Sequence, residues 1–364
     1  MLTSADVHAL GFAPGMTSDA LRSLLRSGLT IDDLTTLPDD DLRRHGLRGK
    51  AIRALHDPRP YYDEAERQRS VAAERCDRII TIADDDYPAA LRQIWSAPIA
   101  LYVRGALLPE DERAIAIVGT RNGSVYGKIT AERYAREITR AGVAVVSGLA
   151  RGVDMWAHKA AMEGRGRTIA VVASGLDMIQ PMAAAALAER IAGQGAIVTE
   201  YPFGARAQRS YFPQRNRIIS GITRATLVVE SDERGGAMIT ARYALDQNRD
   251  VFAVPGPIGS PKSRGTNELI RTDRARLTQT PDDLLEALGY RVAPPEGMAA
   301  EPAAALGLSL FEQKVHDILG AEPRHIDEIG IHAGLAPGEL MVTLLSLEFK
   351  GLVRQMAGKM FLRG

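Results

Sequence analysis

The stretch FPQRNRIISG, residues 212–221, sets two guanidinium groups near the start of an expected helix. Pro213 suits a first helical turn, because its missing N–H is no loss there. The helix dipole places partial positive charge at this end, so Arg215 and Arg217 each cost about 0.3–1 kcal/mol unless an anion lies among them. Residues two apart on a helix point away from each other, so at most one of these arginines faces that anion directly. Asn216 between them can bind a phosphate, bind a base edge or cap the turn.

Glycine turns follow several short apolar runs, and an Arg or Ser accompanies each of them. The turns are GTRNG (119–123), SGLARG (147–152), SG (174–175) and RGGA (234–237). Gly lets a backbone approach a ligand closely, and free N–H groups at a helix start bind phosphate. One such turn is ordinary turn chemistry. Four of them at the carboxyl ends of parallel strands would meet at one edge, where open α/β sheets bind ligands, and they predict an anion site.

The residues predicted to form this site share a place at that edge, with Phe203 added as a stacking ring. They are Gly119, Thr120, Arg121, Ser147, Gly148, Arg151, Phe203, Arg215, Asn216, Arg217, Gly235 and Gly236. Residues 201–276 carry 13 Arg or Lys against 7 Asp or Glu, whereas the whole chain has 45 of each charge. Cations on phosphates with rings beside them are typical of single-strand binding. The rings of Tyr211 and Phe212 fit base stacking and packing on the sheet edge equally well.

Catalytic and cofactor motifs are weak in this sequence. It contains no GxGxxG and no GxxxxGK[ST], so dinucleotides and nucleoside triphosphates lack their usual fingerprints. Asp154 and His158 are four residues apart near Ser147, but there is no GxSxG, and we interpret the pair as a local hydrogen bond. The histidines lack metal-ligand spacing and Cys76 is the only cysteine, so we expect neither a metal nor a cofactor.

The elements that position these residues follow from the pattern of apolar runs. From about residue 112, six short runs alternate with longer amphipathic stretches. Each run is apolar nearly throughout and ends in a small or turn residue, as strands buried on both faces of a parallel sheet do. The alternation predicts an α/β fold with a doubly wound parallel sheet over residues 75–290. The runs are AIAIVGT, VAVVSGL, TIAVVASG, AIVTEYP, ATLVVES and DVFAVPG.

The flanks of this sheet are expected to be helical. Residues 1–58 carry leucines at helical spacing, which predicts a bundle of short helices with a protein-contact or spacer role. Residues 291–306 form a Pro/Ala linker, and residues 307–364 have the layout of a winged helix, three helical segments and a hairpin. The second helix of its turn, which starts at Pro337, has no Lys or Arg before Lys350. We therefore expect this module to contact protein rather than a DNA groove.

Composition bounds the class of protein. The chain of 364 residues exceeds one ordinary domain, and 45% of its residues are apolar, enough for a sizeable core. A single cysteine excludes an internal disulfide and fits a reducing cytosol. No run approaches the roughly 18–20 apolar residues of a membrane span, and the N-terminus lacks the pattern of a signal peptide. We therefore expect a cytoplasmic protein without a membrane span.

Seven motifs, in order along the chain, resemble those of one known family. The sequence is similar to the DprA (DNA processing protein A, or Smf) family. The resemblance implies a SAM-like N-terminal helical domain, an extended Rossmann-like core and a C-terminal winged helix. The motifs are AIVGTRNGSVYG, VVSGLARGVDMWAHKAA, VVASGLDMIQP, TEYPFG, FPQRNRIISGI, ERGGAMITARYALDQNRDVFAVPG and RGTNELIRTDRARL.

The resemblance implies that the protein is not an enzyme. It implies that the protein binds single-stranded DNA, protects it during natural transformation and recombination, and loads the RecA recombinase onto it. It also implies a homodimer formed through the core domain. Replacing Arg121 or Arg217 by Ala is then expected to weaken single-strand binding and flatten its salt dependence. The DNA-contacting positions that it implies include Arg121, Ser147, Gly148, Asn216 and Arg217.

One alternative function stays open at this point. The Gly235–Gly236 turn distantly echoes the phosphate turn of Rossmann-type nucleotide-processing hydrolases, with Glu200 and Arg217 as candidates for their chemistry. The Pro before that turn and the Thr-x-x-Glu after it are absent. The family resemblance is itself imperfect, because Gln180, Met182 and a run of alanines stand where members often carry Tyr-Pro followed by Lys or Asn. Release of free base from nucleoside monophosphates would distinguish the two functions.

Overall fold

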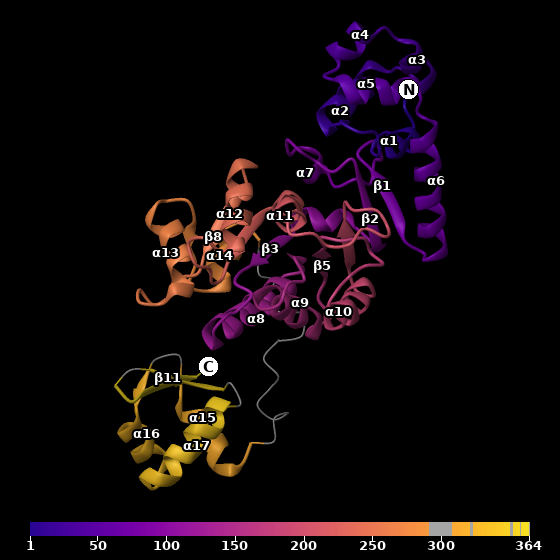
Figure 1. The fold of residues 1–364 in the computed structure, drawn as a ribbon. Helices are drawn as coiled ribbons and strands as arrows, with labels where there is room; N and C mark the ends of the chain where they lie inside the picture. Colours follow the sequence, from indigo (N-terminus) through magenta and orange to yellow (C-terminus); the bar gives the residue numbers. More distant parts are fainter. Residues whose placement is uncertain (291–307, 321–322, 350–351, 357, 364) are drawn as a thin grey trace. The chain divides into compact units, whose positions relative to one another are not determined.

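The computed structural model of the chain describes residues 1–290, 308–320, 323–349, 352–356 and 358–363. They fall into two compact units, Met1–Val292 and Ala293–Gly364, each with its own hydrophobic core (Figure 1). The linker predicted at 291–306 lies outside the described residues. The helices before residue 58 belong to the first unit together with the sheet, so a separate domain that ends there stays a prediction.

A nine-stranded sheet forms the centre of the first unit. Its strands are β1 Arg78–Thr81, β2 Ala100–Gly105, β3 Ile115–Val118, β4 Val145–Ser147, β5 Thr168–Val171, β6 Ala196–Thr199, β7 Ala225–Val228, β8 Asp250–Ala253 and β9 Arg276–Leu277. They lie in the order β1-β2-β6-β5-β4-β3-β7-β8-β9. From β6 to β9 all neighbours pair parallel, whereas β1 and β2 are antiparallel at one edge. The six runs predicted from the sequence are strands β3 to β8, which confirms the doubly wound α/β prediction.

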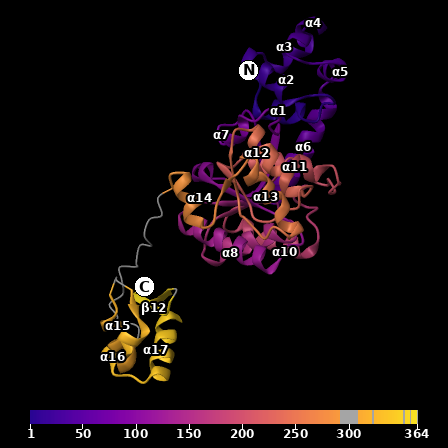
Figure 2. The same cartoon turned by 90° about the vertical axis from the view of Figure 1, so that its left-hand side faces the viewer.

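Helices cover both faces of this sheet (Figures 1 and 2). The side chains of β3 alternate between the two faces of the sheet. Ile115 and Ile117 belong to one buried cluster, and Ala116 and Val118 belong to another. On the first face pack α8 Val125–Arg140, α9 Val153–Glu163, α10 Met182–Ala192 and α14 Pro281–Ala287. On the second face pack α11 Tyr211–Gly221, α12 Gly236–Asp246 and α13 Arg264–Arg271.

The N-terminal residues are helical, as their leucine spacing predicts. Most leucines of these helices are buried in the cluster that also covers the second face of the sheet, and Leu25 is half-buried against it. Short 3-10 turns occur at η1 Pro109–Arg113 and η2 Pro261–Ser263. The helices are α1 Ser4–Leu10, α2 Ser18–Ser27, α3 Ile31–Thr36, α4 Asp39–Arg44, α5 Gly49–His56, α6 Arg59–Glu74 and α7 Ala89–Arg92.

The second unit is a winged helix, as the sequence predicts. Its sheet has the order β10-β12-β11, and its small core contains Val315, Ile329, Leu344 and Phe361. In the described part of the chain no single helix is long and apolar enough to cross a membrane. The elements of this unit are α15 Leu310–Ile318, β10 Arg324–His325, α16 Ile326–Ala333, α17 Pro337–Phe349, β11 Val353–Met356 and β12 Met360–Arg363.

Candidate nucleic-acid interface

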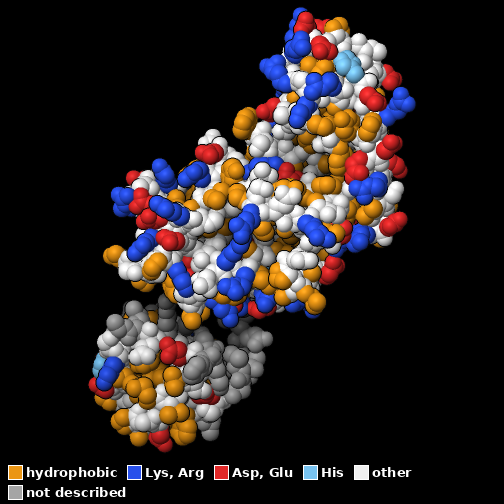
Figure 3. Space-filling view, in the orientation of Figure 1, with side chains coloured by type: hydrophobic (Ala, Val, Ile, Leu, Met, Phe, Trp, Pro, Cys, Tyr) orange, Lys and Arg blue, Asp and Glu red, His pale blue; other side chains and the backbone are white. Residues whose placement is uncertain are grey.

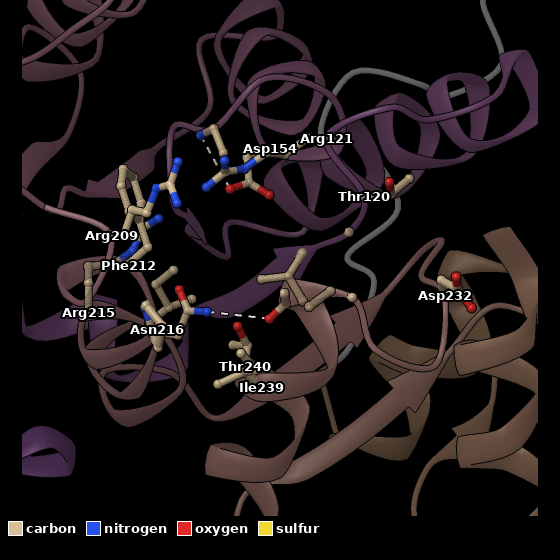
Figure 4. Close-up of a pocket in the computed structure, with 18 residues that line it drawn as sticks. Thr120, Arg121, Asp154, Arg209, Phe212, Arg215, Asn216, Asp232, Ile239 and Thr240 are labelled. Carbon is tan, nitrogen blue, oxygen red and sulfur yellow. Dashed lines mark hydrogen bonds between the residues drawn. The ribbon is translucent and has the colours of Figure 1, made fainter. Parts of the chain in front are cut away.

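The main pocket lies where the direction of winding changes. From β3 the chain builds β4, β5 and β6 on one side and β7, β8 and β9 on the other. In open α/β sheets the ligand crevice opens at this point, beyond the carboxyl ends of the strands. A pocket of about 580 Å³ is found there (Figure 4). Its lining includes Gly119, Thr120, Arg121, Asp154, Arg209, Phe212, Arg215, Asn216, Asp232, Gly235 and Gly236.

A second hollow of about 460 Å³ adjoins the first. The two pockets share Arg121, Ala150, Phe212 and Arg215 as common walls. The second is mostly apolar, and Gly148 and Arg151 line it together with side chains from α9 and α10. We call the two hollows together the edge groove. The structure thus brings most of the predicted anion-site residues into one groove, with a more polar half (the first hollow) and a more apolar half (the second).

Arg121 and Phe212 form a stacked pair at the border between the two halves. The guanidinium carbon of Arg121 lies 5.1 Å from the centre of the Phe212 ring. The Arg121 side chain is exposed, and within the described residues no carboxylate lies within ion-pair distance of it. Stacking holds the guanidinium plane in place, and its N–H edges stay free for an anion.

Arg209 is a lining residue that the sequence analysis did not single out. It lies in the loop before α11, is exposed, and forms no ion pair within the described parts of the chain. Asp232, an acidic side chain of this pocket, lies on the far side from it (Figure 4). The signal that could have revealed it is the segment GARAQRS, which sets Arg206 and Arg209 directly before the start of a helix. A free cation thus borders the pocket from a second loop.

Arg215 depends less on an external anion than its position near a helix start suggests, because its hydrogen-bond partners lie within the protein. The side chain is 4% exposed, and Nη1 donates to the carbonyl oxygens of Gly148, at 2.6 Å, and Val171. Burial lowers the pKa of Arg215 to about 10, an effect that nearby Asp154 opposes. The guanidinium therefore stays charged at neutral pH, and it satisfies carbonyls at the ends of β4 and β5 while facing both pockets.

Three predicted site residues lie outside the edge groove, each for a packing reason. Arg217 pairs with Glu200 and lines a different pocket, of about 410 Å³, between the N-terminal helices and the sheet. Ser147 is fully buried, and its hydroxyl donates to the carbonyl oxygen of Ile117 at 2.6 Å. Phe203 is 5% exposed and packs edge-to-face on a buried tyrosine ring. None of these three side chains is free to meet DNA in this structure.

The glycines of the groove differ in whether a side chain would fit at their positions. A Cβ on Gly119 would lie 2.5 Å from Val153, and one on Gly148 would lie 2.5 Å from Arg215, so both are needed for packing. A Cβ on Gly236 would meet nothing within 4 Å, and this residue opens α12 at the pocket. Gly235 is the N-cap of α12, and no side chain caps that helix. Its first N–H groups are therefore the backbone donors best placed for an anion.

The N-terminus of α8, by contrast, is already occupied by a carboxylate of the chain itself. This helix follows β3, the position at which dinucleotide-binding sheets hold a phosphate group. Here the buried Glu230 carboxylate accepts hydrogen bonds from Ser124, at 2.9 Å from its backbone nitrogen and 2.5 Å from its hydroxyl. Ser124 in turn caps the helix. An internal anion thus occupies the usual phosphate position, which disfavours a nucleotide ligand there.

Asp154 and His158 are not bonded to each other, so the interpretation of a local hydrogen bond between them is wrong. His158 Nδ1 lies 2.7 Å from the Thr168 hydroxyl, and Asp154 accepts from the backbone of Ala150 at 3.3 Å. Full burial lowers the pKa of His158 to about 3 and raises the pKa of Asp154. In the described ranges no three His, Cys, Asp or Glu side chains gather as a metal site requires.

Comparisons with known proteins agree with this geometry. The family described as DNA recombination-mediator protein A matches residues 78–289, and the DprA winged helix domain matches residues 299–359. Protein Smf of Escherichia coli (strain K12) is 36% identical over 286 residues, which cover 77% of this chain and 76% of that protein. The DNA processing protein DprA of Bacillus subtilis (strain 168) is 35% identical over 264 residues, 72% of this chain and 86% of that protein.

Two solved structures share the fold. The X-ray structure of DNA processing protein A from Streptococcus pneumoniae has a TM-score of 0.66 at 31% identity and covers 78% of this chain and 97% of that one. The DNA processing protein A of Helicobacter pylori, solved to describe its single-stranded DNA binding mode, has a TM-score of 0.53 at 28% identity, covering 59% and 98%. From the motifs, the fold and these matches, the chain belongs to the DprA/Smf family of DNA recombination-mediator proteins.

Proposed function

We propose that this protein binds single-stranded DNA in the edge groove. The observation that carries the proposal is the exposed Arg121 guanidinium stacked on Phe212, with Arg209 beside the same pocket. In Figure 3 Lys and Arg side chains are spread over this face of the first unit, with Asp and Glu side chains among them. The Helicobacter pylori relative, which binds single-stranded DNA, supports the same ligand.

The groove separates the two parts of a nucleotide by chemistry. Phosphates meet Arg121, Arg209 and the uncapped N-terminus of α12 in the polar half. Bases stack against Phe212 and enter the apolar half, where their loss of water costs little. A duplex hides its base faces in the stack, so this division of contacts favours single strands.

The finer role follows from the family rather than from the groove. We propose that the protein acts without catalysis, protects single-stranded DNA and loads the RecA recombinase onto it in natural transformation and recombination. A homodimer through the core domain belongs to the same proposal. The alternative of a nucleotide-processing hydrolase gains no support, because Glu200 and Arg217 are paired away from the edge groove and Glu230 closes α8.

The experiment compares fluorescence anisotropy of a labelled oligothymidylate and of a duplex of equal length at about 50 and 200 mM salt. We expect tighter binding of the single strand, with an affinity that falls as salt rises. Phe212→Ala should weaken binding about tenfold without changing the salt slope, because it removes stacking and no charge. Arg133→Ala, which changes an exposed arginine of α8 outside both pockets, controls for the loss of a charge away from the groove and should bind as the unaltered chain does. Equal affinity for single strand and duplex would refute the proposal.

A further inference from the structure

Helix α17 of the winged helix is apolar on all sides, yet only one side is covered. Leu340, Leu344 and Leu347 are at most 2% exposed in the core of the second unit. Met341, Val342 and Leu345, on the other side of the helix, are 49%, 69% and 52% exposed. Hydrophobic side chains are open on the face of this unit seen in Figure 3. A helix apolar all round normally lies in an interior, but within the described residues of this unit nothing covers the outward side of α17.

The charges of α16 and α17 disfavour one class of ligand and one kind of assembly. Residues 326–349, which contain α16 and α17, carry Asp327, Glu328, Glu339 and Glu348 and no Lys or Arg. A helix that enters a DNA groove needs cations for the phosphates, and this one would bring carboxylates to them. A second copy docked face to face would set like charges against each other. The surface that fits is apolar at its centre and basic at its rim.

The spacing of the acidic groups defines the partner further. Glu339 lies one turn before Val342, and Glu348 lies one turn after Leu345, so the two carboxylates border the strip at its ends. They are nine residues apart, about 13 Å along the helix axis. A partner helix laid along α17 would pair with both carboxylates if it carried a Lys or Arg at each end of its apolar strip, with about 13 Å between the two.

We propose that this outward face of α17, formed by Glu339, Met341, Val342, Leu345 and Glu348, docks an amphipathic helix of a partner protein. The partner helix carries Lys or Arg at both ends of its apolar strip. Recognition of an apolar helix face by such a surface is an established mode of peptide binding. Three exposed side chains offer a small contact area, so the complex is reversible, with a dissociation constant in the micromolar range.

The test uses the full chain and two labelled helical peptides of equal length, with the same leucine strip and either Lys or Glu at both ends. Anisotropy should show the Lys-ended peptide binding at least tenfold more tightly. The double variant Val342→Ser/Leu345→Ser should lose that binding at least tenfold, and Glu339→Lys should reduce the preference between the peptides. Met182→Ser, an exposed methionine of the first unit, is the matched control and should bind as the unaltered chain does.

Two outcomes would overturn the proposal. Equal binding of both peptides, or undiminished binding by the double variant with unchanged circular dichroism, would show that this face is not a docking surface for basic helices. A loss of DNA affinity in the double variant equal to that in Arg121→Ala would assign the face to nucleic acid instead. Single-strand binding measured in parallel keeps this test independent of the edge groove, because the double variant should leave it unchanged.

Discussion

Helices α11 and α17 invert the usual relation between side-chain polarity and exposure. The cations of α11 are turned inward, since Arg215 is 4% exposed and the Arg217 side chain 14%. The apolar side chains Met341 and Val342 of α17 are turned outward. The composition of a helix therefore does not reveal which of its faces meets solvent. The cations that reach the surface beside α11 come from neighbouring loops, not from the helix itself.

The surroundings of the two helices explain this difference. α11 passes the carboxyl ends of β4 and β5, whose carbonyls need donors, and the Arg215 guanidinium supplies them. α17 belongs to a small unit with a three-stranded sheet, which has only enough surface to cover one of its sides. An inward cation thus stabilises the fold, and an outward apolar strip stays exposed in the described part of the second unit.

The strongest test of the inward cation is Arg215→Ala. The change leaves two strand-end carbonyls without their donor and removes the positive charge that favours the ionised form of Asp154. We expect the free energy of unfolding of the first unit to fall by about 3 kcal/mol, measured by urea denaturation. Arg133→Ala should change it by less than about 0.5 kcal/mol. Equal stability of both variants would mean that the inward charge contributes nothing to the fold.

The outward cation of the same region is tested by Arg121→Ala. The variant removes an exposed charge and the stack on Phe212, so single-strand affinity should fall about tenfold at low salt. The slope of log affinity against log salt should become shallower by about one unit, because one phosphate contact is lost. Titrations at four salt concentrations measure both quantities. A weaker affinity with an unchanged slope would make Arg121 a packing residue like Arg215.

We expect acid to destabilise the first unit more than the second, because His158 is buried in the first. Its pKa in the folded chain is lowered to about 3 by burial, against about 6.5 when unfolded. The unfolded chain therefore binds a proton that the folded chain does not, and stability present above pH 6.5 is lost as pH falls. Between pH 7.5 and 5.5 we expect a loss of about 1 kcal/mol from this group.

His158→Gln should flatten this pH dependence, and His332→Gln, at an exposed position of α16, should not. Urea denaturation at four pH values measures the slopes. An identical slope in the two variants would remove His158 as the source of acid sensitivity.

Arg217→Ala gives the smallest expected effect on DNA binding. The sequence predicts that this change weakens binding and flattens its salt dependence, as for Arg121. The structure leads us to expect an affinity within twofold of the unaltered chain and an unchanged salt slope, because the side chain pairs with Glu200 outside the groove. Anisotropy with the same oligothymidylate measures it, at a temperature where the variant is folded. A shallower slope would show that the pair opens to meet the DNA.

Strand prediction succeeded where apolar runs are continuous and failed where they are not. The six runs between 114 and 256 became β3 to β8, since burial on both faces demands apolar residues at every position. The edge strand β1 was not predicted, because Arg78–Thr81 mixes exposed and buried residues. β2 was not predicted either, although its central residues are buried. β9 has only two residues, both exposed. The winged helix was predicted from three helical patterns and a terminal hairpin.

The sequence alone was enough to predict the type of fold, the order of its elements and the turns that meet at one edge, because these depend on local residue patterns. It also determined the family, through motifs that recur in order. The three-dimensional structure was needed to tell which cations are free, since Arg121 and Arg215 look alike in sequence but differ in what surrounds them. The structure places Arg209 in the groove, and it places Arg217, Ser147 and Phe203 outside the groove. The physical reason is that a charge takes its role from burial and from its partners, and packing between distant segments sets both.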